Sequence, residues 1–319
     1  MSAKHLNSKL GAVYITLCCL SSAASFVFIA HLNRHHDAML SMAVTFGYAT
    51  ILFSLFNIKK LPVMFRIMRQ NLKPMIYLNT ATLFSWFGTF MALQYIPPAT
   101  KISIGFGLIA ITNFFIAIPL NKLKHHKHLI FCVLFIVLNM ALVVFQFSYT
   151  AHHVTTRDIV IGVAWSVVGG VIGGFIAINA TKLHDVGYTS TQILATRFYL
   201  LVIVSLIVLF CYGHATPIHI AWKYYLLSTL LIVILPLLMY HLSIESLGAL
   251  VTSLVEPFTP VITYFLQIFF LGYRFNIVTL FLLSIASVGI IVLARVEHNA
   301  TSKKQRAVKL KDEVEQSIV

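Results

Sequence analysis

Three charged residues fall well inside long apolar segments of this 319-residue chain: Glu256, Arg197 and Lys101. A charged side chain within a bilayer is costly, so such residues usually serve a function or pair with an opposite charge. Arg197 and Glu256 lie at similar predicted depths, and we expect them to form an ion pair that either clamps two helices or exchanges with a charged substrate. Lys101 either extends to the membrane interface or attracts anions near one mouth of a path.

Polar residues accompany Glu256 on one face of its segment. On a helical wheel, six residues lie within about 60° of it: Thr252, Ser253, Thr259, Pro260, Thr263 and Gln267. This stripe predicts a water-lined path, and the alternative is a polar seam that bonds to a neighbouring helix. Thr112 shares a face with Lys101 in the corresponding segment of the first half, and it is a further candidate for the path.

Asn79 and Trp86 lie on one face of residues 73–95. An amide beside an aromatic ring suits a small amphipathic substrate, although Trp86 could equally fill space between helices. The 14 histidines and four cysteines show no spacing typical of metal ligands, so neither a metal nor a cofactor is predicted. Three prolines are candidate sites of gating motion because each removes a backbone hydrogen bond: Pro236, Pro257 and Pro260.

The elements that must hold these residues are membrane-spanning helices. A chain that is 59% hydrophobic and 10% charged has too little polar surface to form a soluble particle. We predict an all-α protein whose helices are continuous, because lipid offers no partners to free backbone groups. The ten predicted ranges are 10–30, 38–56, 73–95, 98–120, 128–148, 158–181, 190–213, 223–243, 247–271 and 276–294. Two overlapping patterns, Gly169/Gly173 and Gly170/Gly174, predict close packing of one helix against its neighbours.

The second half of the chain repeats the first. Residues 90–144 align with 238–292 at a constant offset of 148, and earlier positions align at 151 or 152, which pairs Phe46 with Phe198. Because each half crosses the membrane five times, the second copy must enter it in the opposite sense. We therefore predict two inverted five-helix repeats, residues 1–148 and 158–297, followed by a mobile tail at 298–319. Inverted repeats of this kind are typical of secondary transporters.

Basic residues predict the orientation. Most of the 23 lysines and arginines lie in the amino terminus, the loops after even-numbered helices and the tail, which places both termini in the cytoplasm. The net charge of +14 therefore reflects topology and contact with anionic lipid, and no nucleic-acid partner is expected. Residues 62–73 mix apolar and basic side chains and predict a short amphipathic helix on the cytoplasmic surface.

Ten helices in two inverted halves resemble the drug/metabolite transporter superfamily, specifically its EamA-type members. The residues that carry the likeness are Ala92–Tyr95, Ala195–Phe198, Leu254–Pro257, Phe270–Gly272 and Ser287–Ile291. The resemblance implies a multi-pass carrier of the inner, cytoplasmic membrane that moves amino acids, related small metabolites or amphipathic compounds, often outward, by alternating access. Its partners are then a small-molecule substrate, the lipid bilayer and, if Glu256 titrates, a coupling proton. We expect a monomer or a homodimer.

Other functions fit the residues less well. A metabolite exchanger or importer for nucleoside-type or nucleotide-sugar cargo should carry more buried cations than Lys101 and Arg197. A channel is disfavoured because two inverted halves suit rocking better than a fixed pore. A membrane-embedded enzyme should show clustered nucleophiles, metal ligands or paired carboxylates, and one intramembrane acid is too few, so no enzymatic activity is predicted.

Overall fold

The computed structural model describes residues 8–117, 127–150, 154–212, 222–243 and 256–292, and the regular secondary structure within these ranges is helical. The helices of the first half are α1 (Ser8–His35), α2 (Ala38–Phe56), η1 (Ile58–Lys60), α3 (Leu61–Gln70), α4 (Leu72–Tyr95), α5 (Pro98–Ala117) and α6 (Lys127–Thr150). The second half contains α7 (Thr156–Asp185), α8 (Ser190–Thr196), α9 (Tyr199–Tyr212), α10 (Trp222–Ser228), η4 (Thr229–Ile234), η5 (Glu256–Phe258) and α12 (Thr259–Leu271). Helical residues 235–243 follow η4, and Ile277–Val292 forms a further apolar helix.

Five of these segments are long and apolar enough to cross a membrane: Leu10–His35, Ala38–Phe56, Thr156–Ile176, Ser190–Cys211 and Lys223–Ser243. Large apolar side chains are exposed along many of the helices, and Phe210 is 85% exposed. Such a surface requires lipid rather than water around it. The structure thus confirms an all-helical protein of the polytopic membrane class.

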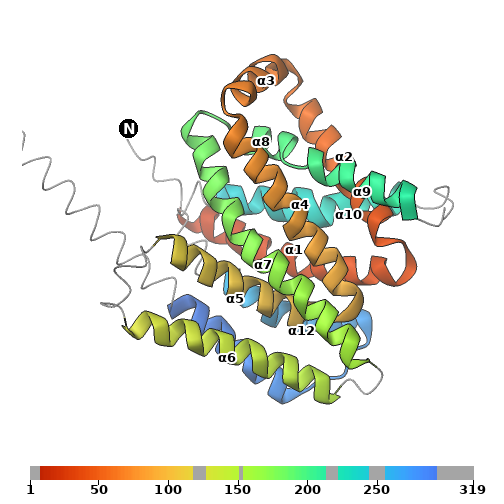
Figure 1. The fold of residues 1–319 in the computed structure, drawn as a ribbon, viewed down its shortest axis with the longest axis vertical. Coiled ribbons are helices and arrows are strands. Elements are labelled where there is room, and N and C mark those ends of the chain that lie inside the picture. The colour runs from red at the N-terminus through yellow and green to blue at the C-terminus, as the bar shows by residue number, and fades with distance from the viewer. Residues whose placement is uncertain (1–7, 118–126, 151–153, 213–221, 244–255, 293–319) are drawn as a thin grey trace, which may run out of the picture.

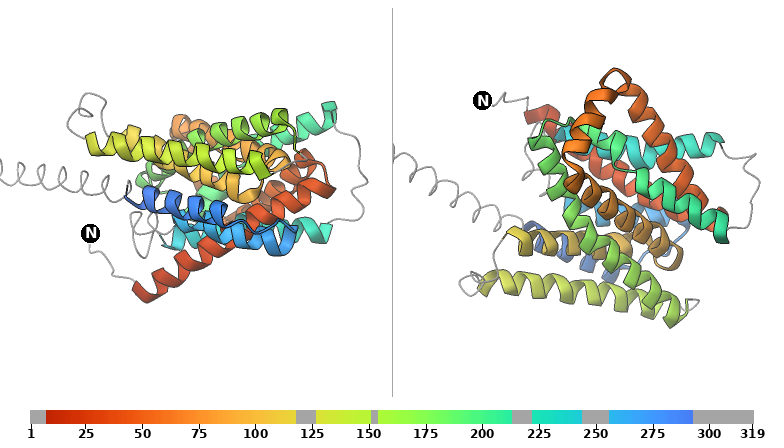
Figure 2. Two further views of the ribbon diagram at one scale, coloured as in Figure 1. Left: turned by 90° about the horizontal axis from the view of Figure 1, so that it is seen from below. Right: turned by 45° about the horizontal axis from the view of Figure 1, so that its top comes forward.

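Helix α7 packs tightly between α4 and α5, as Figures 1 and 2 show. The two glycine pairs predicted for close packing point to different neighbours. A methyl group added at Gly169 would lie 3.1 Å from the Ser85 carbonyl oxygen of α4, and one added at Gly170 would lie 3.0 Å from the Gly105 carbonyl oxygen of α5. Backbones can approach this closely only where side chains are absent, so the predicted role of these glycines is confirmed.

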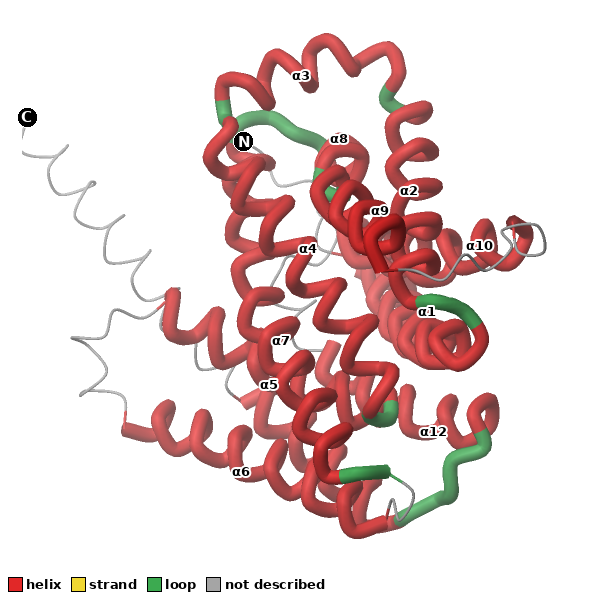
Figure 3. Tube along the Cα trace, turned by 45° about the vertical axis from the view of Figure 1, so that its right-hand side comes forward, coloured by secondary structure: helices red, strands yellow, loops and turns green. Residues whose placement is uncertain are grey.

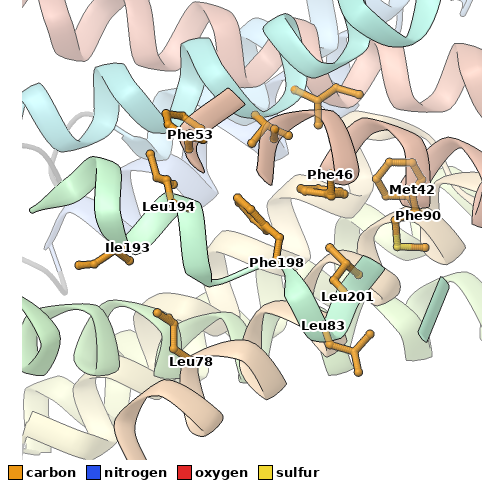
Figure 4. Packing of buried hydrophobic residues seen from close by; sticks show 14 of the residues in the cluster. Met42, Phe46, Phe53, Leu78, Leu83, Phe90, Ile193, Leu194, Phe198 and Leu201 are labelled. Carbon is orange, nitrogen blue, oxygen red and sulfur yellow. The ribbon is translucent and has the colours of Figure 1, made fainter. Parts of the chain in front are cut away.

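An aromatic cluster joins α2, α4 and the short connection between α8 and α9 in the largest buried core (Figure 4). The Phe46 ring lies 5.0 Å from the Phe198 ring and 6.2 Å from the Phe90 ring, measured between centroids. All three side chains are fully buried. Tilted and edge-to-face pairs at these distances add specific attraction to the burial of apolar surface, so the cluster holds the middle of both halves together.

Helix α3 confirms the amphipathic helix predicted after α2, and it lies crosswise at the ends of α2 and α4 (Figure 3). Met64 inserts into the protein core and is almost completely buried. The Tyr188 hydroxyl donates a hydrogen bond of 2.7 Å to the Met64 carbonyl oxygen. Burial raises the pKa of Tyr188 to about 12, so this hydroxyl keeps its proton and its bond at physiological pH.

Two of the predicted helices are not regular. The helix expected over 190–213 is interrupted at Arg197 and Phe198, between α8 and α9, and the helix expected over 223–243 contains the π-helical segment η4. The expectation of continuous helices is therefore wrong. Lipid forbids free backbone groups only where the protein supplies no partners for them, and here neighbouring side chains supply them.

Candidate functional site

The interruption of the helix at Arg197 and Phe198 is held by an amide from another helix. The side-chain nitrogen of Asn79, on α4, donates a hydrogen bond of 3.0 Å to the Thr196 carbonyl oxygen, and its side-chain oxygen accepts one of 3.4 Å from the Leu200 backbone N–H. Asn79 thus satisfies one backbone group on each side of the break. Asn79 therefore bonds to the backbone of α8 and α9 at residues that flank Arg197.

We expect Asn79→Ala to lower the free energy of unfolding by about 2 kcal/mol, because it leaves the Thr196 carbonyl and the Leu200 N–H buried without these partners. The thermal unfolding midpoint in detergent measures the effect. Asn139→Leu is a matched control, since the buried Asn139 side-chain oxygen has no hydrogen-bond partner in the described part of the chain. The control should be neutral or stabilising, and equal losses from both variants would contradict the role of Asn79.

Arg197 directs its side chain into the protein, where it is 4% exposed. Its Nε donates a hydrogen bond of 3.3 Å to the Thr82 hydroxyl of α4, and its guanidinium carbon lies 5.2 Å from the ring centroid of Phe198. A guanidinium carries five N–H donors. Within the residues that the structure describes, this hydrogen bond is the one that Arg197 makes through its side chain, and its other N–H donors have no hydrogen-bond partner there.

Glu256 begins η5, the 3-10 turn that precedes α12. Although both residues are described, Arg197 and Glu256 form no ion pair within 4.0 Å, so this expectation is wrong for the conformation in hand. Glu256 lies instead near Cys18 and Cys19 of α1, and Tyr240 lies near both Arg197 and Glu256. The reason is geometric: Arg197 is turned toward α4, whereas Glu256 faces α1.

Lys101 lies on α5 and is only 6% exposed. Its ammonium nitrogen is 4.6 Å from the ring centroid of Phe26 on α1, a distance typical of a cation–π contact. The side chain therefore does not extend to the membrane interface, which corrects one of its two interpretations. A buried lysine whose recorded contact is an aromatic ring remains able to bind an anionic group.

The polar stripe of α12 faces the protein. Thr259, Thr263 and Gln267 are buried, whereas Phe258 and Phe265 on the other face are exposed. The Gln267 side-chain oxygen accepts a hydrogen bond of 3.0 Å from the Ala99 backbone N–H, and the Thr263 hydroxyl donates one of 2.8 Å to the Thr259 carbonyl oxygen. Gln267 thus forms the polar seam that was the alternative interpretation of the stripe. Ser253 lies outside the described residues.

The remaining candidates are held by neighbouring helices. Trp86 packs against Phe46, with ring centroids 4.9 Å apart, and so fills space between α4 and α2. Thr112 faces Gly174 of α7, where an added methyl group would lie 2.8 Å from the threonine Cβ. These contacts place both residues in the packed interior, at the junctions of α4 and α5 with other helices.

The prolines mark departures from regular helix. Pro236 follows η4, the π-helical segment Thr229–Ile234, and Pro257 lies within the 3-10 turn η5. The Ser287 hydroxyl donates a hydrogen bond to the Pro257 carbonyl oxygen, and Pro260 occupies the first turn of α12. A π-helical turn or a change from 3-10 to α-helix is a common location for bending.

Tyr240 and Phe26 were not predicted from the sequence. Tyr240 lies near both Arg197 and Glu256, and Phe26 contacts the Lys101 ammonium group. Neither residue is polar enough to stand out in an apolar segment. Tyr240 directly precedes His241, a buried titratable residue, and this neighbour is the one sequence feature that could have indicated a functional role for Tyr240.

Residues 160–295 match the model of the EamA-like transporter family, which is part of the drug/metabolite transporter superfamily. Over this segment the chain is similar to EamA-like transporters. The match confirms, over this segment, the resemblance inferred from the sequence, and the apolar helices indicate a multi-pass membrane protein. No curated protein matches the chain. The EamA-like segment contains Arg197, Tyr240 and Glu256, whereas Asn79 and Lys101 come from the first half.

Proposed function

We propose that this EamA-like protein is a secondary active transporter that exports amino acids or related small metabolites by alternating access. Ten transmembrane helices form two inverted five-helix repeats, with both termini in the cytoplasm and the protein in the cytoplasmic membrane. The observation that carries the proposal is a contact between equivalent positions of the two halves. Phe46 and Phe198, paired by the sequence repeat, pack ring against ring with centroids 5.0 Å apart. Contact between a residue and its own counterpart is expected on a two-fold axis.

Hydrogen bonds near this axis support the same symmetry. Thr45 directly precedes Phe46, and Thr196 lies two residues before Phe198. The Thr45 carbonyl oxygen accepts a hydrogen bond of 3.0 Å from the Thr229 hydroxyl, and the Thr196 carbonyl oxygen accepts one of 3.0 Å from the Asn79 amide. A side chain from the third helix of each repeat therefore donates to a backbone carbonyl in the second helix of the other repeat. Two inverted copies around one axis explain this correspondence.

Helix packing also supports two inverted repeats. Helix α7, the first of the second repeat, packs on α4 and α5, the third and fourth predicted helices of the first repeat. Helix α1, the first of the first repeat, packs on η4 and α12, which belong to the third and fourth predicted helices of the second repeat. Each repeat thus inserts its first helix between the same two helices of the other. Rocking of such interlocked repeats is the usual basis of alternating access.

The buried charges support a small zwitterionic cargo. Arg197 and Lys101 present cations in the interior without a carboxylate partner in the described ranges, and Glu256 supplies an anion next to Tyr240. A substrate carboxylate can compensate the cations while a substrate ammonium group compensates Glu256. Helix irregularities adjoin these charges, with the break at Arg197 and the 3-10 turn at Glu256, and broken helices frequently form the binding sites of transporters.

Purified protein in liposomes tests the proposal through counterflow of labelled amino acids and related metabolites. A carrier accumulates the labelled substrate against preloaded unlabelled substrate, and the rate saturates. Ion conductance without saturation would indicate a channel, and preference for nucleosides or nucleotide sugars over amino acids would overturn the proposed cargo. Protein without activity on any member of a broad panel would also count against the assignment.

Glu256→Gln separates coupling from binding. If Glu256 carries the coupling proton, the variant should lose most of the stimulation by a pH gradient and retain counterflow at saturating substrate, because exchange needs no net proton movement and high substrate concentration offsets the weaker binding of the ammonium group. Initial rates with and without the gradient measure this effect. A carboxyl group placed at position 267 should not replace the one at position 256. The double variant Glu256→Gln with Gln267→Glu should therefore behave as Glu256→Gln does. Unchanged stimulation in Glu256→Gln would remove this carboxyl group from the coupling step.

A further inference from the structure

The outward face of α3 combines exposed basic and exposed apolar side chains. Phe65 is 47% exposed and Val63 is 50% exposed, while Arg66 and Arg69 of the same helix are also exposed. On the helix, Phe65 and Arg69 are four residues apart and therefore neighbours on the surface. The opposite face, with Met64, packs into the core. One face of α3 thus packs against the protein, and the other face is exposed.

The residues that lead into α3 extend this surface. Lys59 and Lys60 are exposed in η1, next to the exposed side chains of Phe56 and Ile58. No aspartate or glutamate occurs in the sequence between Asp37 and Asp158. Within the residues that the structure describes, none of the four cations Lys59, Lys60, Arg66 and Arg69 has an ion-pair partner. We call these four residues the α3 cation cluster.

The location of α3 between α2 and α4 indicates which partner fits the α3 cation cluster. Helix α3 connects the end of α2, a segment apolar enough to cross a membrane, to the start of α4 after a single residue, Asn71. It therefore lies at the boundary between hydrocarbon and water, where apolar side chains enter the lipid and basic ones remain among the headgroups. An acidic soluble protein would match the charge but would leave Phe65 and Val63 without apolar contacts. Anionic lipid matches both.

We propose that the α3 cation cluster binds the headgroups of anionic phospholipids, with Phe65 and Val63 inserted among the acyl chains. Two hydrogen bonds hold the cluster in place from the protein side. The Tyr188 hydroxyl bonds to the Met64 carbonyl, and the Thr191 hydroxyl donates to the Asn57 side-chain oxygen at 3.3 Å. The surface is thus preorganised, and lipid need not order α3 in order to bind.

The full-length Phe65→Trp variant in lipid nanodiscs provides the test. Brominated acyl chains quench tryptophan on contact, so brominated phosphatidylglycerol and brominated phosphatidylcholine are compared at equal fractions in an unbrominated phosphatidylcholine background. Quenching is corrected for Trp86, Trp165 and Trp222 with the parent chain. We expect the added tryptophan to be quenched more by the anionic lipid than by the zwitterionic one, since each basic residue near the surface strengthens anionic binding by roughly fivefold.

Two charge variants decide whether the preference belongs to α3. Arg66→Gln with Arg69→Gln should remove most of the preference while both lipids still quench. Arg157→Gln with Arg274→Gln removes two exposed charges at other places and should leave the preference unchanged. Equal quenching by both lipids in Phe65→Trp, no quenching by either, or equal losses in both double variants would each overturn the proposal. The assay needs no transport activity, so its result is independent of the proposed function.

Discussion

Gly88→Ala is expected to lower the free energy of unfolding by about 2 kcal/mol, within the range of about 1–3 kcal/mol typical of overpacking. The added methyl group would lie 2.7 Å from the Trp165 carbonyl oxygen and 3.1 Å from the Gly169 nitrogen, both in the backbone of α7. A backbone carbonyl in a helix cannot turn aside as a flexible side chain can. Relief of the overlap requires α4 and α7 to separate, which also loosens the neighbouring contact of Ser85 with Gly169.

Gly47→Ala is the matched control. Gly47 lies within α2, and an added methyl group there would meet nothing within 4 Å. Alanine is favoured over glycine in a helix by up to about 1 kcal/mol, so this variant should be neutral or stabilised. Thermal unfolding of both variants in the same detergent measures the difference. If the two substitutions change stability in the same direction, the tight packing of α4 against α7 is not what limits stability.

Arg197→Gln should reduce the initial rate of transport roughly a hundredfold at substrate concentrations well below saturation. The proposed role is a charge-assisted hydrogen bond to a substrate anion, and bonds to charged groups contribute about 1.5–3 kcal/mol, with tenfold in affinity for each 1.4 kcal/mol. Counterflow measured over a range of substrate concentrations should show the loss mainly in apparent affinity. Arg197→Lys keeps the charge and should recover part of the affinity.

Controls distinguish this role from a structural one. Thr82→Val removes the hydroxyl that accepts from Arg197 Nε and should lower affinity less than Arg197→Gln does, because the charge remains. The unfolding midpoint of Arg197→Gln should stay near that of the parent. Since Arg197 and Glu256 form no ion pair in this conformation, the exchanged pair Arg197→Glu with Glu256→Arg should not restore transport. Recovery of full transport by that exchange would show that the two charges pair during the cycle.

The positions of the helices could be predicted from the sequence, while their irregularities could not. The segment predicted over 73–95 is α4 (Leu72–Tyr95), and the segment predicted over 38–56 is α2 with the same bounds. Long apolar runs encode such helices locally, since lipid leaves the backbone no better arrangement. The break at Arg197 depends on an amide of α4 that is 117 residues away along the chain, and no local pattern contains that information.

Which polar residues are buried was also predictable, but not their partners. The stripe on α12 faces inward as its periodicity indicates, and Arg197 and Lys101 are buried as their place in apolar segments indicates. Whether Arg197 contacts Glu256 or Thr82, and whether Lys101 contacts lipid or Phe26, depends on how each helix is rotated about its axis. That rotation is set by packing across the bundle, including the close approach of α7 to α4 and α5.

By itself, the sequence determined the membrane class, the approximate span of each apolar helix, the family resemblance and the amphipathic character of α3, because hydrophobicity and its periodicity are properties of consecutive residues. Only the tertiary structure decided that Arg197 turns toward α4, that Glu256 faces α1 beside Tyr240, and that Phe46 meets its counterpart Phe198. These outcomes depend on distances between helices far apart in the chain, and the free energy of close packing selects them only when all the helices assemble together.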